Sequence, residues 1–140
     1  MSSLYSNTSG FAPSIWGPPL WRSLHYVAAS FSCAPSAETR RAYLAFFRSL
    51  GNVLPCGMCR SHYMQHIRSG PLKLSLATVK DRKTLFGWTV RLHDAVTRSQ
   101  GRVPPKPPRG GWYRQFDKDR PSPGSSPSPS PSPRLNNRKK

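Results

Sequence analysis

Residues 54–59 read Leu54-Pro55-Cys56-Gly57-Met58-Cys59 and contain two of the three cysteines of the chain. Proline suits the first turn of a helix, so this stretch predicts a helix that begins beside Cys56. The two sulfurs then lie one turn apart and can close a small disulfide. The positive end of a helix also stabilises a thiolate, which is the reactive form of cysteine. Three cysteines are too few for a disulfide framework, so the pair indicates redox or metal chemistry.

A zinc site is the main alternative to a redox pair, because two histidines follow the cysteines. The four candidate ligands are Cys56, Cys59, His62 and His66. A helix of about ten residues spans about 15 Å, whereas zinc holds its ligands at about 2.0–2.3 Å. One straight helix cannot bring all four ligands to one ion, and a zinc site would have to recruit His25 or His93. We therefore expect no resident metal.

Apolar side chains recur every three or four residues on both sides of the cysteine pair, which is typical of amphipathic helices. The stripes are Leu20, Leu24, Val27, Ala28 and Phe31 before it, then Tyr43, Phe46, Phe47, Leu50 and Leu54, and finally Leu85, Trp88, Leu92, Ala95 and Val96. No segment alternates polar and apolar residues for long, which argues against strands. The pattern predicts an all-α fold, a small bundle of four or five helices.

Boundary residues place these helices along the chain. Pro18 and Pro19 suit the first turn of the first helix, and Ser36 is the expected N-cap of the second. Gly70 and the proline after it end the third helix. The fourth is expected from about residue 80 to residue 100. Either Ser75 or Thr78 is its expected cap.

The prolines divide the chain. Of the 16 prolines, ten lie between Pro104 and Pro133, and a segment so rich in Pro and Ser buries too little apolar surface to offset its ordering entropy. We expect a polar lead-in over 1–13, one folded domain over 14–103, and a basic, largely disordered tail over 104–140. A domain this small has a thin core and benefits from a cofactor or a dimer interface.

The charge of the chain is strongly positive. There are 22 Lys or Arg and 5 Asp or Glu, for a net charge of +17. Such a field favours anionic partners, and weak contact between the basic tail and nucleic acid is one expectation. No run approaches the ~20 apolar residues of a membrane span. Residues 1–10 are polar and lack the pattern of a secretory signal.

Residues 16–25, Trp16-Gly17-Pro18-Pro19-Leu20-Trp21-Arg22-Ser23-Leu24-His25, resemble the W-G-P-x-x-W-x-x-L-H opening of the Erv/ALR sulfhydryl oxidases, in particular their viral branch. The cysteine pair resembles the redox helix of that family. Residues 93–97, His93-Asp94-Ala95-Val96-Thr97, resemble its H-N-x-V-N motif. The resemblance covers about residues 14–101, and the combination of motifs is highly specific.

This resemblance implies a helical, FAD-binding thiol oxidase that acts on dithiol protein substrates. Electrons would pass from the cysteine pair through the flavin to dioxygen and give hydrogen peroxide. The family forms homodimers through its first helices, so a homodimer is expected. The viral-type opening points to host cytoplasm, a viral assembly site or the virion. The alternative is a non-enzymatic zinc- or nucleic-acid-binding helical module.

The resemblance also implies which residues form the site. The catalytic disulfide would be Cys56–Cys59, with Cys56 exchanging with substrate and Cys59 nearer the flavin. Family positions implied to contact the cofactor are Gly17, Trp21, His25, Arg82, Trp88, His93, Asp94, Val96 and Thr97. Aromatic faces suit a flat ring, and a basic residue such as Arg82 suits the pyrophosphate.

The chain departs from the family pattern at several positions. Asp94 and Thr97 stand where the family usually has two Asn, and an ionised Asp accepts hydrogen bonds but cannot donate them. Cys33 is the only spare thiol. It is interpreted either as a small buried apolar residue or as a thiol with a relay or intersubunit role. Residues 104–116, with Trp112 and Tyr113, either fold back over the flavin or form a linker.

Overall fold

The computed structural model describes residues 10–124 and contains five helices over that range. These are α1 (Pro13–Ala29), α2 (Ala37–Val53), α3 (Gly57–Arg68), α4 (Arg82–Ser99) and α5 (Gly111–Asp117). Within the described range, extended pairing is limited to an isolated bridge between Gly10 and Cys56. The all-α prediction is confirmed. No helix of the described residues is both long and apolar enough to cross a bilayer.

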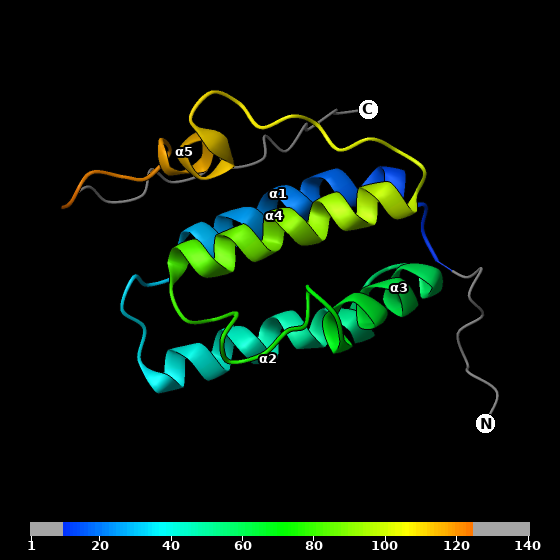
Figure 1. Cartoon of the computed structure of the whole chain (residues 1–140), viewed down its shortest axis with the longest axis horizontal. Helices are drawn as coiled ribbons and strands as arrows, with labels where there is room; N and C mark the ends of the chain where they lie inside the picture. Colours follow the sequence, from blue (N-terminus) through cyan, green and yellow to red (C-terminus); the bar gives the residue numbers. More distant parts are fainter. Residues whose placement is uncertain (1–9, 125–140) are drawn as a thin grey trace, which may run out of the picture.

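The helices form two layers (Figure 1). Helices α1 and α4 lie side by side, α2 and α3 form the other layer, and α5 packs on the outer side of α1 and α4. The core between the layers contains the fully buried side chains of Phe47, Leu85 and Trp88. The ring of Phe47 meets the ring of Trp88 edge-on at 5.3 Å. These contacts join α2 to α4 and fix the separation of the layers.

The caps agree with the sequence at α2 and differ at α4. Ser36 Oγ accepts a hydrogen bond from Thr39 N at 3.1 Å, as predicted. At α4 the cap is Asp81, whose carboxylate accepts from Thr84 N at 2.8 Å. Thr78 instead accepts from the backbone of Ser75 inside the connector. An Asp stabilises a helix N-terminus through its charge as well as its hydrogen bond, which explains why it serves here.

Helix α1 begins earlier than the sequence suggested. Pro13 occupies its first turn, so Pro18 and Pro19 lie inside the helix. Each internal proline removes one helical hydrogen bond. Trp16 Nε1 donates to Phe11 O at 2.9 Å and holds the start of the helix. The extra turn brings Trp16 and Gly17 onto the same helix as Trp21.

The segment after α4 folds back onto the bundle. Phe116 of α5 packs edge-on against the rings of His25 and Tyr26, with centroid distances of 5.3 and 4.8 Å. The hydroxyl of Tyr26 donates to Asp119, and Arg120 Nη2 donates to Ala29 O at 2.6 Å. Part of the range expected to be a tail, residues 111–120, is therefore folded against α1 and α4. Residues 125–140 of that expected tail lie outside the described residues.

Candidate functional site: a cavity between the redox helix and a histidine pair

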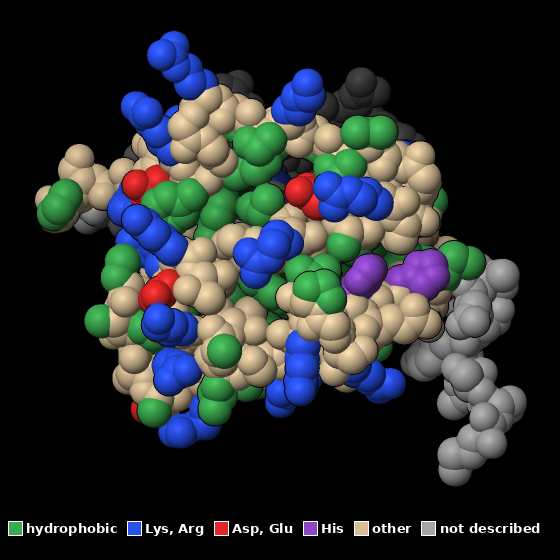
Figure 2. Space-filling view, in the orientation of Figure 1, with side chains coloured by type: hydrophobic (Ala, Val, Ile, Leu, Met, Phe, Trp, Pro, Cys, Tyr) green, Lys and Arg blue, Asp and Glu red, His purple; other side chains and the backbone are tan. Residues whose placement is uncertain are grey.

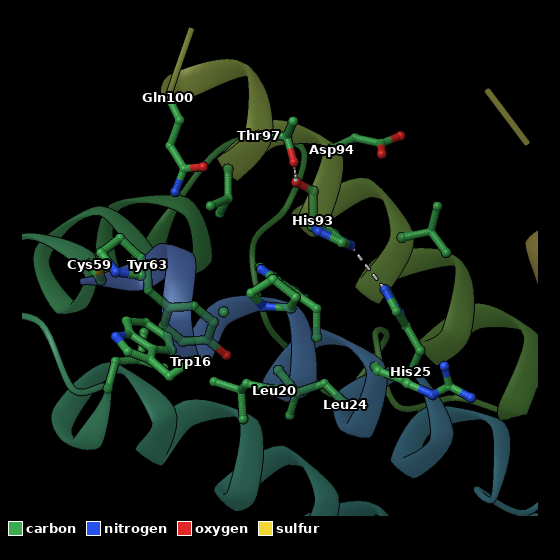
Figure 3. A pocket seen from close by; sticks show the side chains of 18 of the residues that line it. Trp16, Leu20, Leu24, His25, Cys59, Tyr63, His93, Asp94, Thr97 and Gln100 are labelled. Atoms are coloured by element: carbon green, nitrogen blue, oxygen red, sulfur yellow. Dashed lines mark hydrogen bonds between the residues drawn. The ribbon is translucent and has the colours of Figure 1, made fainter. Parts of the chain in front are cut away.

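A cavity of about 760 Å³ lies among α1, α3, α4 and α5. Its volume falls within the range of about 300–1,000 Å³ typical of small-molecule and cofactor sites. Most of its wall is apolar, and it includes Trp16, Leu20, Leu24, Tyr63, Val96, Trp112 and Phe116. Figure 3 shows Cys59 and Tyr63 on one side of the cavity and His25 and His93 on the other. The cavity therefore connects the cysteine helix with the α1–α4 layer.

The cysteine pair lies at the start of α3. Cys56 is the N-cap residue, and its sulfur accepts a hydrogen bond from Cys59 N at 3.3 Å. Cys59 lines the cavity, whereas Cys56 does not. Burial, together with the neighbouring Cys56, raises the pKa of the Cys59 thiol to about 12. In the dithiol state Cys59 is therefore protonated at neutral pH.

Three rings from α1 and α4 form the other side of the cavity. Trp21 and His93 stack with centroids 4.3 Å apart and planes within 9°. His25 Nε2 and His93 Nδ1 are 3.1 Å apart (dashed line in Figure 3). His25 Nδ1 lies 3.0 Å from Thr89 Oγ1. The rings are thus held both by stacking and by hydrogen bonds.

Both histidines of this cluster are neutral at physiological pH. Burial, followed by the neighbouring His93, lowers the pKa of His25 to about 4. Burial also lowers the pKa of His93, against a smaller opposing effect of Asp94. Neutral imidazoles carry one N–H each, so each ring has one donor nitrogen and one acceptor nitrogen.

Charged and polar side chains also line the cavity. Arg22, Asp94, Thr97 and Arg102 line it. Thr97 Oγ1 donates to His93 O at 2.9 Å, so its hydroxyl hydrogen is already used. Guanidinium groups here suit a phosphate-bearing ligand. Figure 2 shows Lys and Arg side chains spread over the visible face, and they do not gather in one patch.

Most of the predicted cofactor residues meet in this cavity, but two do not. Gly17, Trp21, His25, His93, Asp94, Val96 and Thr97 line it. Trp88 lies in the core, 2% exposed, and its Nε1 donates to Leu72 O at 2.9 Å. Arg82 Nε donates to Phe31 O. Trp88 Nε1 and Arg82 Nε are thus bonded to backbone carbonyls, and neither residue lines the cavity.

The remaining cysteine is distant from the Cys56–Cys59 pair. Cys33 is exposed, so its interpretation as a buried apolar residue is wrong. It lies in the connection from α1 to α2, at the end of the bundle opposite the start of α3 (Figure 1). That separation leaves no direct exchange between Cys33 and Cys56 within one folded chain.

Several cavity residues were absent from the sequence-predicted site. Trp16, Leu20 and Tyr63 line the cavity. Trp16 belongs to the opening motif and was a detectable candidate. Phe116 reaches the cavity because α5 folds back, which was one of the two alternatives expected for residues 104–116. Among residues 10–124, no three His, Cys, Asp or Glu side chains gather closely enough to hold a metal ion.

Sequence comparison gives the family. The model of the Erv1/Alr family matches residues 18–112, which include the cysteine helix and the ring cluster. The chain belongs to the Erv1/Alr family. An Acanthamoeba polyphaga mimivirus protein named as a probable FAD-linked sulfhydryl oxidase is 34% identical over 91 residues. That alignment covers 65% of this chain and 62% of the viral protein.

A second relative is the FAD-linked sulfhydryl oxidase of African swine fever virus, 31% identical over 83 residues, with 59% of this chain and 66% of that protein covered. The chain thus spans less than two thirds of the length of either viral relative. The yeast Erv1 core matches with a TM-score of 0.61 at 22% identity, over 84% of this chain and 90% of that one. The crystallised FAD-binding domain of Saccharomyces cerevisiae Erv1 matches with a TM-score of 0.62 at 19% identity, over 77% and 92%. The helical arrangement is therefore the Erv1 fold.

Proposed function

We propose that this protein is an FAD-linked sulfhydryl oxidase that converts dithiols of substrate proteins into disulfides and reduces dioxygen to hydrogen peroxide. The observation that carries the proposal is one cavity shared by the Cys59 thiol and the stacked rings of Trp21 and His93. The names of the two viral relatives support it independently.

The cavity suits FAD in size, shape and chemistry. The Trp21 ring offers a flat apolar face for a planar heterocycle. Arg22 and Arg102 offer positive charge for a pyrophosphate. FAD held by these residues would supply two-electron redox chemistry between the cysteine pair and dioxygen, which with two protons gives hydrogen peroxide.

Substrate oxidation is thiol–disulfide exchange at Cys56. A substrate thiolate attacks Cys56 Sγ of the Cys56–Cys59 disulfide, and Cys59 Sγ leaves with the electron pair. The second substrate thiolate then attacks the substrate sulfur of the mixed disulfide and displaces Cys56. The substrate loses two electrons and the cysteine pair gains two. Cys56 suits this role because its sulfur lies outside the cavity wall and accepts an amide hydrogen bond at the helix N-terminus.

The proposal includes a homodimer formed through the first two helices. Ile15 of α1 is 73% exposed and Phe46 of α2 is 41% exposed. Large apolar side chains in these positions would be covered by such an interface. The proposal places its action in host cytoplasm, at a viral assembly site or in the virion, as the resemblance to the viral branch implies.

The test is dithiol-dependent oxygen uptake by the purified protein, together with its flavin content. We expect about one FAD per chain and steady peroxide formation. Cys59→Ser should abolish turnover and keep the flavin, whereas Cys33→Ser should match the unaltered protein because Cys33 lies at the opposite end of the bundle. A colourless protein with stoichiometric zinc would instead support the metal-binding alternative.

A further inference from the structure

A directed chain of hydrogen bonds leads from the backbone of α4 to the cavity. Thr89 Oγ1 donates its single hydrogen to Phe86 O at 2.7 Å. The hydroxyl is then only an acceptor toward His25 Nδ1, which lies 3.0 Å away. His25 must therefore hold its proton on Nδ1, and its Nε2 is left with a lone pair.

The same reasoning assigns the proton of His93. Because His25 Nε2 is an acceptor, the 3.1 Å contact requires the proton of His93 to lie on Nδ1. His93 Nε2 is then also an acceptor, and the described residues give that nitrogen no hydrogen-bond partner. His93 lines the cavity, and its ring plane is held by the Trp21 stack.

We propose that Thr89 is a positioning residue: acting through His25, it fixes the Nδ1–H tautomer of His93, so that His93 Nε2 selects a hydrogen-bond donor on the nucleotide part of the cofactor. The identity of that ligand rests on the proposed FAD site. The assignment of protons to the Nδ1 atoms of His25 and His93 does not rest on that site, because it follows from protein atoms alone.

Burial stabilises the chain of hydrogen bonds that runs from Thr89 through His25 to His93. Thr89 is 1% exposed and His25 is 7% exposed, so water does not compete for their hydrogen bonds. Lowered pKa values keep both imidazoles neutral near pH 7, which leaves one proton for each ring. A ring with a fixed proton binds a ligand without first reorienting, and this preorganisation favours affinity.

Nitrogen NMR of the imidazoles in the purified protein tests the order directly. We expect both His25 and His93 to be neutral and protonated on Nδ1. In Thr89→Ser the hydroxyl remains and the order should persist, whereas in the near-isosteric Thr89→Val it should be lost. A His93 ring protonated on Nε2 in the unaltered protein would overturn the proposal, whatever the stability of the valine variant.

The dissociation constant of FAD supplies the second measurement. Loss of one ordered hydrogen bond should weaken FAD binding by about 2- to 10-fold in Thr89→Val, and Thr89→Ser should stay close to the unaltered protein. Equal affinity in Thr89→Val, measured on folded protein, contradicts the positioning role. A protein that binds no FAD contradicts the proposed function, and the NMR result then still decides the tautomers.

Discussion

Trp21 of α1 and His93 of α4 lie face to face, with ring centroids 4.3 Å apart and planes within 9°. Because the two residues are 72 positions apart in the chain, the stack also joins the helices that form the cavity wall. It also places Trp21 and His93 beside the buried His25, whose ring centroid lies 6.0 Å from that of Trp21 and 5.4 Å from that of His93.

The first prediction separates Trp21 from Trp88. Trp21→Ala should weaken FAD binding by about 10-fold because it removes a stacking face. It should lower the free energy of unfolding only slightly, because Trp21 is partly buried. Trp88→Ala should lower the free energy of unfolding by about 3–5 kcal/mol, because the side chain is fully buried. Flavin titration and denaturant unfolding of both variants check this. An equal loss of unfolding free energy in the two variants would contradict the assignment of Trp21 to the cavity and of Trp88 to the core.

The second prediction concerns the close contact between α2 and α3. A Cβ at Gly51 would lie 2.0 Å from Met64 Sδ, so Gly51→Ala must displace that side chain and should cost about 1–3 kcal/mol. Gly87 is the matched control, because its Cβ would meet only the end of Arg91 at 3.3 Å. Gly87→Ala should stabilise the protein by about 0.5–1 kcal/mol. Thermal unfolding distinguishes the two; a neutral Gly51→Ala would show that the helices can separate without cost.

The third prediction is a loss of stability in mild acid. Folding lowers the pKa of His25 from 6.5 to about 4, so the unfolded chain binds more protons between these values. Stability is therefore retained above pH 6.5 and falls as the pH drops toward 4. His25 should account for about 2 kcal/mol between pH 7 and pH 5.

The measurement is the unfolding free energy at both pH values. His25→Gln removes the titrating ring, so the difference between the two proteins isolates it from the carboxylates. An identical pH slope in His25→Gln would show that the ring does not titrate in this range.

The fourth prediction concerns the helix that closes the cavity. A chain that ends after Pro108 lacks α5, whose Trp112 and Phe116 line the cavity. It should be less stable, because the partly buried side chains of α5 lose their packing against the bundle, and it should retain less FAD. A chain that ends after Gly124 keeps every described contact of α5 and is the control. Similar melting temperatures for the two truncated proteins would show that α5 does not contribute to stability.

Local patterns predicted the helices well because each helix is specified by its own neighbours in sequence. The stripe of α2 and its cap at Ser36 lie within one short segment; the cap was found as expected, and Phe47 and Leu50 of the stripe are buried, whereas Phe46 is exposed. The signal for the helix that begins beside the cysteine pair also lay within one short segment. The start of α1 was missed because Pro18 and Pro19 are tolerated inside a helix whose first turn is already held by Pro13 and Trp16.

The site was less predictable, because burial depends on packing between distant segments. Trp88 has the residue type of a cofactor contact, yet the contact with Phe47 of α2 places it in the core. Likewise, the sequence left open whether residues 104–116 fold back or form a linker, because the contact of Phe116 with His25 requires the chain to reverse after α4. The relay from Thr89 to His93 depends on atom positions that spacing alone does not give.

The central claim is that electrons leave substrate thiols through Cys56 and Cys59 and reach a flavin in the adjacent cavity. The most direct measurement is the absorbance of the bound flavin when a small dithiol is added without oxygen, in the unaltered protein and in Cys56→Ser, Cys59→Ser and Cys33→Ser. We predict rapid bleaching by about one dithiol per flavin, recovery on admitting air, unchanged behaviour in Cys33→Ser, and a stable colour in the other two variants. Rapid bleaching in both Cys56→Ser and Cys59→Ser, or no bleaching in the unaltered protein, would contradict the account.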